Sequence, residues 1–312
     1  ARQFLTQDGS LDRNRIWDST AINGVENLVA TSMRLLIPQS QPWCEITWKS
    51  DKVKKSLGAK YAAKMKENNA RLKQHWFDSN FYTAVSEALV DAVVGGTLAL
   101  QIIDEVGKPL DYIAINTAEL YILENDEGRV DVVIREHSMF AKDIVRRFSN
   151  SAPDEVRKAA TDQVDKKFSV IEIVMPCGAA NAYQVWLKET RTPLLTQKTA
   201  LSPFIICRWS KILGSPWGNS PVRNALGPIR GVNKLCESEI VWKEFHAKGA
   251  WQVQDETLNT ENLQSKIIPG GLIALDKPLQ QIPFPGQVQL YDQMIEKMRD
   301  QIKVLLFDNT PP

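Results

Sequence analysis

Apolar residues recur at helical spacing over three stretches near the start of the chain. The first stretch ends at Pro38, as helices commonly do before a proline. The third is bounded by Ser79-Asn80 and Gly95-Gly96, which are residue types typical of the two ends of a helix. Between the first two stretches, alternating apolar residues over 43–48 predict a short strand. Helices are predicted over 11–37, 51–76 and 81–94.

From Thr97 onward the apolar residues change to a period of two, which indicates strands. The turn residues Asn125-Asp126-Glu127-Gly128 separate two such segments and predict a hairpin. Ser138 is a candidate cap of a short helix through Phe148, and another helix follows the polar link at 150–153. Strands are predicted over 98–103, 112–115, 120–123, 130–136, 168–175, 182–188 and 204–209. This order of elements predicts a mixed α+β domain.

The pattern changes again at Ser220-Pro221, which has the arrangement of a helix start. A helical pattern follows as far as Lys248, and Gly227-Pro228 within it either kinks the helix or marks its true start. A final helix is predicted over 287–306, with its apolar residues inside an arc of about 120°. The proline- and glycine-rich segment between these helices is too small to form a core. Two helices with one-sided apolar stripes therefore protrude, and partner subunits are expected to cover them.

Composition and charge narrow the class of protein. A chain of 312 residues with 43% hydrophobic and 24% charged residues has room for two domains and a sizeable core, which excludes wholesale disorder. Its formal net charge of +1 is lower than that expected of a protein that binds nucleic acid tightly through an excess of basic residues. The longest apolar stretch without a charge, between Asp91 and Asp104, is too short to cross a bilayer, so no membrane contact is expected.

Side chains capable of catalysis or metal binding form no recognisable motif. The histidines His75, His137 and His246 have no zinc-binding spacing and are interpreted as structural. The residue two positions before Ser215 is Leu213 and not the glycine that a nucleophile elbow requires. The carboxylate pairs at 104–105, 126–127 and 255–256 are interpreted as solvated turn acids. We therefore expect no enzyme, no cofactor and no metal.

Basic residues cluster within 52–73 and are opposed there by Glu67 and the preceding Asp51. Such a cluster either contacts nucleic acid or is a solvated helix face, which is the commoner case. The sequence leaves both interpretations open.

Several groups of residues, in the same order along most of the chain, resemble the head-to-tail connector (portal) proteins of short-tailed bacteriophages. They are Asp18-Ser19-Thr20-Ala21 with Pro38 and Pro42-Trp43; Ser79-Asn80-Phe81-Tyr82 with Glu87, Asp91 and Gly96-Thr97; Arg135-Glu136-His137 with Ala141 and Phe148; and Trp217-Gly218-Asn219-Ser220-Pro221-Val222 with Ala225-Leu226, Ile229 and Asn233-Lys234. Cys44 and His137 stand where the family usually has an aromatic residue, and Trp217 replaces its tyrosine. The order of these groups is more specific than any one of them.

The resemblance implies an α+β wing domain and a two-helix stem that carries a small β-containing clip, assembled into a ring. In these terms the chain comprises a wing (1–217), a first stem helix (218–249), a clip (250–286), a second stem helix (287–306) and the start of a channel loop (307–312). The family continues beyond this point, so we expect the chain to be part of a longer protein.

The implied function is that of a portal subunit, in a ring of about twelve copies at the capsid vertex. The ring is a conduit for DNA packaging and ejection and a docking site for the packaging motor and the tail. Expected partners are further copies of the chain, double-stranded DNA, the terminase large subunit, tail adaptor proteins, and capsid and scaffolding proteins. The expected location is the virion, after assembly in the bacterial cytoplasm.

Three sets of residues are candidates for these roles. The clip acids expected to meet the motor or tail are Asp255, Glu256 and Glu261. The residues expected near DNA in the channel are Lys234, Lys243, Arg299, Lys303 and Asn309. The residues expected to pack the stem between subunits are Tyr291, Met294, Met298 and Ile302. Interleaved carboxylates on both stem helices predict that the channel passes DNA without gripping it.

The alternative is an α+β enzyme that processes polynucleotides through a site without a recognisable motif. The helix–excursion–helix order and the absence of catalytic motifs favour the portal hypothesis. Rings in electron micrographs would support the portal, whereas nuclease-active monomers would support the enzyme.

Overall fold

The computed structural model of the chain describes residues 16–104, 110–149, 151–163, 165–248, 251–253, 272–274 and 288–308. The chain forms two units, which we treat separately. The larger unit is Glu26–Arg223, and the smaller unit combines Ala1–Val25 with Asn224–Pro312. The mixed α+β class is confirmed. None of the helices in the described ranges has the length and apolar character needed to cross a bilayer.

The first helices are α1 (Thr20–Leu36), α2 (Asp51–Asp78) and α3 (Phe81–Gly95). The predicted start of the first helix is wrong, since residues 16–19 are not helical, while 11–15 lie outside the described residues. Asp18 Oδ1 accepts a hydrogen bond of 3.0 Å from the Thr20 amide. A carboxylate at this place satisfies an amide that has no partner within the helix, which fixes the start at Thr20.

The strand predicted over 43–48 is also wrong, because this segment is irregular. The Asn69 side chain on α2 forms two hydrogen bonds with the backbone of Ile46. Its Oδ1 accepts from the Ile46 amide at 2.6 Å, and its Nδ2 donates to the Ile46 carbonyl at 3.2 Å. Trp43 stacks on Trp76 with ring centroids 4.4 Å apart. Trp43 therefore packs on a helix, and the backbone of Ile46 bonds to a side chain.

The strands form two main antiparallel sheets in the larger unit. The first has the order β2-β1-β8 and the second the order β3-β4-β5-β6-β7. The strands are β1 (Thr97–Ile103), β2 (Asp111–Ala114), β3 (Leu120–Glu124), β4 (Val130–Phe140), β5 (Lys167–Cys177), β6 (Ala180–Leu187), β7 (Thr192–Thr199) and β8 (Phe204–Arg208). The short helix η3 (Thr117–Glu119) precedes β3. The predicted hairpin at 125–128 is confirmed as the link between β3 and β4.

Two details of the second sheet differ from the sequence pattern. β7 was missed, because TPLLTQKT has little apolar alternation and contains a proline, which is tolerated on an edge strand. The helix predicted from Ser138 begins later, as α4 (Ala141–Arg147), because pairing with β5 extends β4 through Phe140. The helix predicted after Pro153 is confirmed as α5 (Asp154–Asp162).

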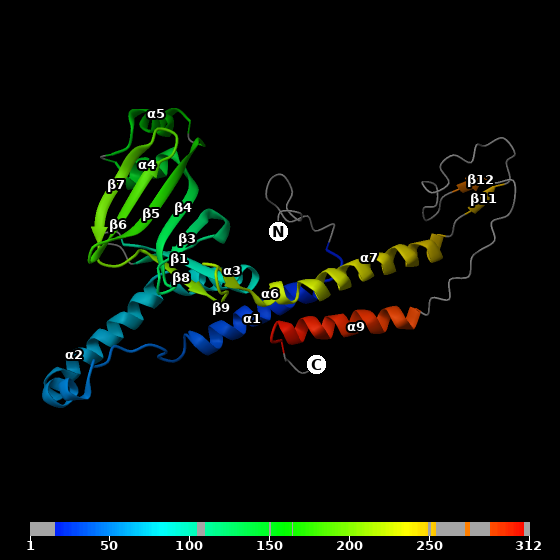
Figure 1. Cartoon of the computed structure of the whole chain (residues 1–312), viewed down its shortest axis with the longest axis horizontal. Helices are drawn as coiled ribbons and strands as arrows, with labels where there is room; N and C mark the ends of the chain where they lie inside the picture. The colour runs from blue at the N-terminus through cyan, green and yellow to red at the C-terminus, as the bar shows by residue number, and fades with distance from the viewer. Residues whose placement is uncertain are drawn as a thin grey trace. The chain divides into compact units, whose positions relative to one another are not determined.

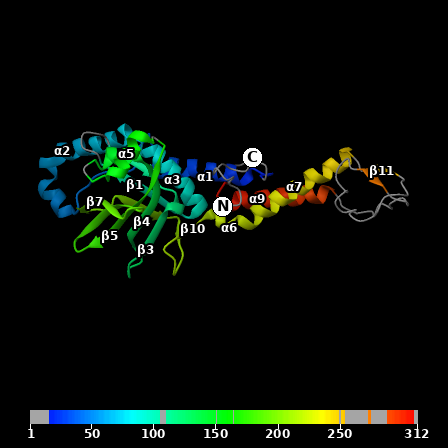
Figure 2. The same ribbon diagram turned by 90° about the horizontal axis from the view of Figure 1, so that it is seen from above.

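The core of the larger unit lies between the second sheet and the helices α4 and α5, which cover one face of it (Figures 1 and 2). Alternate strand residues such as Val170 and Val185 meet Ile144 and Val156 from these helices. Phe204 from the first sheet joins the same cluster. Continuous burial of these side chains supplies most of the hydrophobic stabilisation of this unit.

A polar cluster lies inside this core around Glu172, which is fully buried on β5. Glu172 Oε2 accepts hydrogen bonds from Gln101 Nε2 at 2.6 Å and from the Tyr183 hydroxyl at 2.5 Å. Arg135 Nη1 donates to Gln101 Oε1 at 2.8 Å. His137 Nε2 lies 3.7 Å from Glu172 Oε1, and burial lowers the pKa of His137. The same burial raises the pKa of Tyr183.

Two groups that carry the family resemblance meet at Gly96 and Gly218. The Gly218 amide donates to Thr97 Oγ1 at 3.1 Å, and the pairs Ser210–Lys211 (β9) and Gly218–Asn219 (β10) form a small ladder. Gly96 has a left-handed backbone with φ of 89°. A Cβ built on Gly218 would lie 2.0 Å from the Gly96 carbonyl oxygen, so no side chain fits there.

The helix predicted from residue 220 to 248 is two helices, α6 (Pro221–Asn224) and α7 (Leu226–Lys248), separated at Ala225. Of the two alternatives for Gly227-Pro228, a helix start is the one observed, since both residues lie in the first turn of α7. Proline is tolerated there because its missing amide has no acceptor to lose. The final helix is confirmed as α9 (Val288–Leu305).

Candidate functional site

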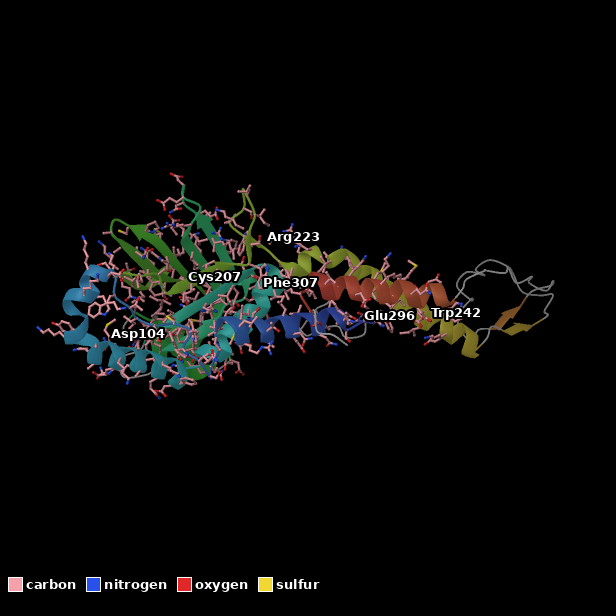
Figure 3. All side chains as sticks on the ribbon, turned by 90° about the horizontal axis from the view of Figure 1, so that it is seen from below. Asp104, Cys207, Arg223, Trp242, Glu296 and Phe307 are labelled. Atoms are coloured by element: carbon pink, nitrogen blue, oxygen red, sulfur yellow. The ribbon has the colours of Figure 1, made fainter. Side chains whose placement is uncertain are left out.

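The helices α7 and α9 of the smaller unit lie side by side (Figures 1 and 3). Each contributes buried residues, Val232 and Cys236 from α7 and Ile295 and Ile302 from α9. A Cβ on Gly231 would lie 3.1 Å from Met298 Sδ, so this glycine lets the two helices approach closely. The pair is therefore a packed helical hairpin with its own small core.

Arg299 of α9 is the main polar link within this unit. Its Nε donates to Asp18 Oδ2 at 2.9 Å, and its Nη1 donates to Glu296 Oε1 at 2.7 Å. The Asp18 side chain is almost fully buried, while the Arg299 side chain is one-third exposed. The hydrogen bond to Asp18 raises the pKa of Arg299, so the guanidinium stays charged. Burial raises the pKa of the neighbouring Cys236 thiol.

Asn233 of α7 ties the same N-terminal segment to the other helix. Its Oδ1 accepts a hydrogen bond of 2.8 Å from the Trp17 amide, and the Asp18 amide lies 3.3 Å from the same oxygen. A short segment next to α1 is thus bonded to both α7 and α9. Sequence reasoning missed this arrangement, because Asp18 and Arg299 are 281 residues apart and no local pattern relates them.

The four residues expected to pack the stem between subunits occupy different positions. Ile302 is fully buried within its own chain, and Met298 is half-buried against Gly231. Tyr291 and Met294 are exposed, at 46% and 45% of their surface. Only the last two are available to a second molecule. Further large apolar side chains are exposed on the same two helices: Ile240, Val241, Trp242, Val304 and Leu305.

Each cation expected near the channel that lies in the described residues has a carboxylate partner. Lys234 Nζ lies 2.9 Å from Glu237, and Lys303 Nζ lies 3.5 Å from Asp300. Lys243 pairs with Glu239, and this hydrogen bond raises the pKa of the lysine. Arg299 has the two partners given above. The positive charge of these four side chains is therefore locally balanced.

The remaining candidates, Asp255, Glu256, Glu261 and Asn309, lie outside the described residues. Of the segment between α7 and α9, the structure describes the strands β11 (Trp251–Val253) and β12 (Leu272–Ala274), which pair in parallel. Across the described part of the chain, no three histidine, cysteine or acidic side chains gather closely enough to hold a metal ion.

Comparison with known proteins gives consistent matches over most of the chain. The family described as "Bacteriophage head to tail connecting protein" matches residues 2–310. A "Probable portal protein" of Bordetella phage BPP-1 is 22% identical over 88% of this chain and 52% of its own length. A "Portal protein" of Escherichia phage T7 is 24% identical over 78% of this chain and 46% of its own length. The chain thus spans about half the length of these curated relatives.

Among solved structures, the Epstein-Barr portal matches 93% of this chain and 67% of its own chain, at 11% identity and a TM-score of 0.27. A similarity of this size carries no argument about the fold.

Proposed function

The chain belongs to the family of bacteriophage head to tail connecting proteins, and from this we propose that it is a portal subunit, one of about twelve in a closed ring at the capsid vertex. The ring is the conduit through which double-stranded DNA is packaged and ejected. The subunit has no catalytic role of its own and needs no cofactor.

The observation that carries this proposal is the exposed apolar surface of the helical hairpin. Tyr291 and Met294 on α9 and Trp242 on α7 are each more than 40% exposed. A two-helix unit cannot cover both faces of its helices, and a neighbouring copy supplies the missing cover. In a ring, each subunit offers two different faces to its two neighbours, so the contact is heterologous.

The parts of the chain take the following roles in this proposal. The wing comprises 1–217, the first stem helix 218–249, the clip 250–286 and the second stem helix 287–306, followed by the start of a channel loop at 307–312. The clip docks the terminase large subunit during packaging and tail adaptors afterwards. Capsid and scaffolding proteins contact the ring in the virion and during assembly in the host cytoplasm.

The stem passes DNA without holding it. A protein that neutralises many phosphates binds DNA tightly and with a steep salt dependence. Here Lys234, Lys243, Arg299 and Lys303 of α7 and α9 each lie beside a carboxylate, which reduces their attraction for a duplex. Tight binding would oppose translocation, so this balance suits a conduit.

The experiment that tests the proposal is native mass spectrometry of the purified chain, combined with negative-stain microscopy. Closed rings of uniform subunit number are expected. Monomers that degrade polynucleotides would overturn the proposal in favour of the α+β enzyme.

A further inference from the structure

The helix α2 concentrates lysine and arginine side chains in a short segment. Its 28 residues carry eight lysines and arginines against three acids, a net charge of +5. The whole chain has a net charge of +1, so all the other residues together sum to −4. The eight cationic side chains are all exposed: Lys52, Lys54, Lys55, Lys60, Lys64, Lys66, Arg71 and Lys73.

The cations of α2 have few partners within the chain. In the part of the chain that the structure describes, one of them, Arg71, forms an ion pair, at 2.6 Å from Glu67. Lys60 and Lys64 are four residues apart on one helix face, a spacing at which like charges destabilise a helix. By contrast, Lys234, Lys243 and Lys303 of α7 and α9 each lie beside a carboxylate.

α2 is also a long helix held at one end. The hydrogen bonds and ring contacts that tie it to the described remainder of its unit come from its C-terminal half, through Asn69, Trp76 and Phe77. Its N-terminal end lies away from both sheets of that unit (Figure 1). At 1.5 Å per residue the helix is about 42 Å long. An uncompensated charged helix of this kind, which packs little of its own surface, is suited to an external polyanion.

We propose that α2 is a docking surface for the phosphate backbone of duplex DNA, independent of base sequence, and that it supplies most of the DNA affinity of this protein. Exposed ion pairs between two polypeptides contribute little free energy without apolar anchors. DNA binding instead gains from the release of condensed counterions, which requires only closely spaced cations and no complementary shape. Lysines, as point charges on flexible side chains, suit phosphates approached from any direction.

This inference rests on the proposed function only for the choice of DNA as the polyanion. Ring formation is measured by mass, whereas α2 is tested by DNA titration, so the two proposals can fail separately. The probe is a duplex of about 30 base pairs, titrated into the full chain over a range of salt concentrations.

The test compares three triple variants that change the net charge equally. The first variant replaces Lys55, Lys60 and Lys64 of α2 by Gln, whose helix propensity is close to that of lysine. The second variant replaces three exposed lysines elsewhere in the larger unit by Gln: Lys142, Lys158 and Lys198. Lys234, Lys243 and Lys303→Gln alters the stem. We expect the α2 variant alone to weaken binding about tenfold or more and to lower the salt slope by about two to three.

Each other outcome overturns the inference. Equal weakening in all three variants would show a general effect of net charge, and weakening only in the stem variant would place DNA at the channel. Competition by poly-glutamate as effective as that of unlabelled duplex would indicate an acidic polypeptide partner. Replacing the three α2 lysines by arginine keeps the charge, and loss of binding in that variant would also contradict the proposal.

Discussion

Asp18 and Arg299 form an ion pair of 2.9 Å between the start of the described chain and its last helix. The carboxylate is nearly fully buried, and the guanidinium is also bonded to Glu296. A buried carboxylate that loses its charged partner is costly, because it is neither solvated nor neutralised. This pair therefore links residues 16–18 to the helical hairpin.

Replacing Arg299 by Gln is expected to lower the free energy of unfolding by about 1–3 kcal/mol, because Asp18 is left buried without a cation. Urea unfolding measures this change. Replacing the exposed Glu296 by Gln is the matched control, with an expected loss below about 0.5 kcal/mol. Equal losses in the two variants would contradict the assigned importance of Asp18.

Replacing Gly218 by Ala is expected to cost about 2 kcal/mol or more, because its methyl group would overlap the Gly96 carbonyl oxygen. Thermal unfolding measures the loss. The control is Gly227→Ala, since a Cβ on Gly227 meets no atom within 4 Å. A Gly218→Ala variant as stable as the native chain would show that this close approach does not exist.

Replacing both Tyr291 and Met294 by Asp is expected to abolish rings while the chain stays folded, because both side chains are exposed within one subunit. Native mass spectrometry and circular dichroism measure the two properties. The control replaces Gln293 and Gln301, two exposed polar residues of α9, by Asp. It adds the same charge and is expected to leave rings intact. Ile302→Asp is unsuitable for this test, since Ile302 is buried inside its own chain. Rings that survive the Tyr291 and Met294 changes would remove these residues from the interface.

Replacing Asp255, Glu256 and Glu261 by Ala is expected to weaken binding of the terminase large subunit or a tail adaptor about tenfold, if these acids meet a basic surface. Surface plasmon resonance with the assembled ring measures the affinity. Removing three exposed acids of the larger unit, Asp126, Glu127 and Glu155, is the control. Unchanged affinity would show that the clip acids do not contribute.

Stability is expected to fall as the pH drops below about 6.5, because burial holds the pKa of His137 below its ordinary value of 6.5. In that range the unfolded chain binds a proton that the folded chain does not, so acid favours unfolding. The decline stops once the pH passes below the folded-state pKa. His137→Gln should remove this part of the pH dependence, whereas the exposed His75→Gln should not. Identical pH profiles for the two variants would contradict this role of His137.

The classes of the elements could be predicted from the amino-acid pattern, because helical and alternating periodicities are local properties of a chain. The sequence predicted α2, α3 and α9 closely, and it left open whether Gly227-Pro228 kinks a helix or begins one. Its residue groups also indicated the family, which the comparisons confirmed. The prediction failed where backbone hydrogen bonds are made to groups far away in the sequence. The Ile46 amide bonds to the Asn69 side chain, and the strand β4 continues beyond Ser138 because it pairs with β5.

Which residues of a stripe are buried, and which charges far apart in the chain form pairs, depends on tertiary packing. The sequence predicts a single apolar face on the last helix. In the structure Ile302 is buried and Tyr291 is exposed, because packing against a second helix covers only part of that face. Likewise, the pair of Lys234 and Glu237 is three residues apart and visible in the sequence, whereas the pair of Arg299 and Asp18 joins residues 281 positions apart. Burial and pairing depend on which segments meet in space, and a local pattern does not contain that information.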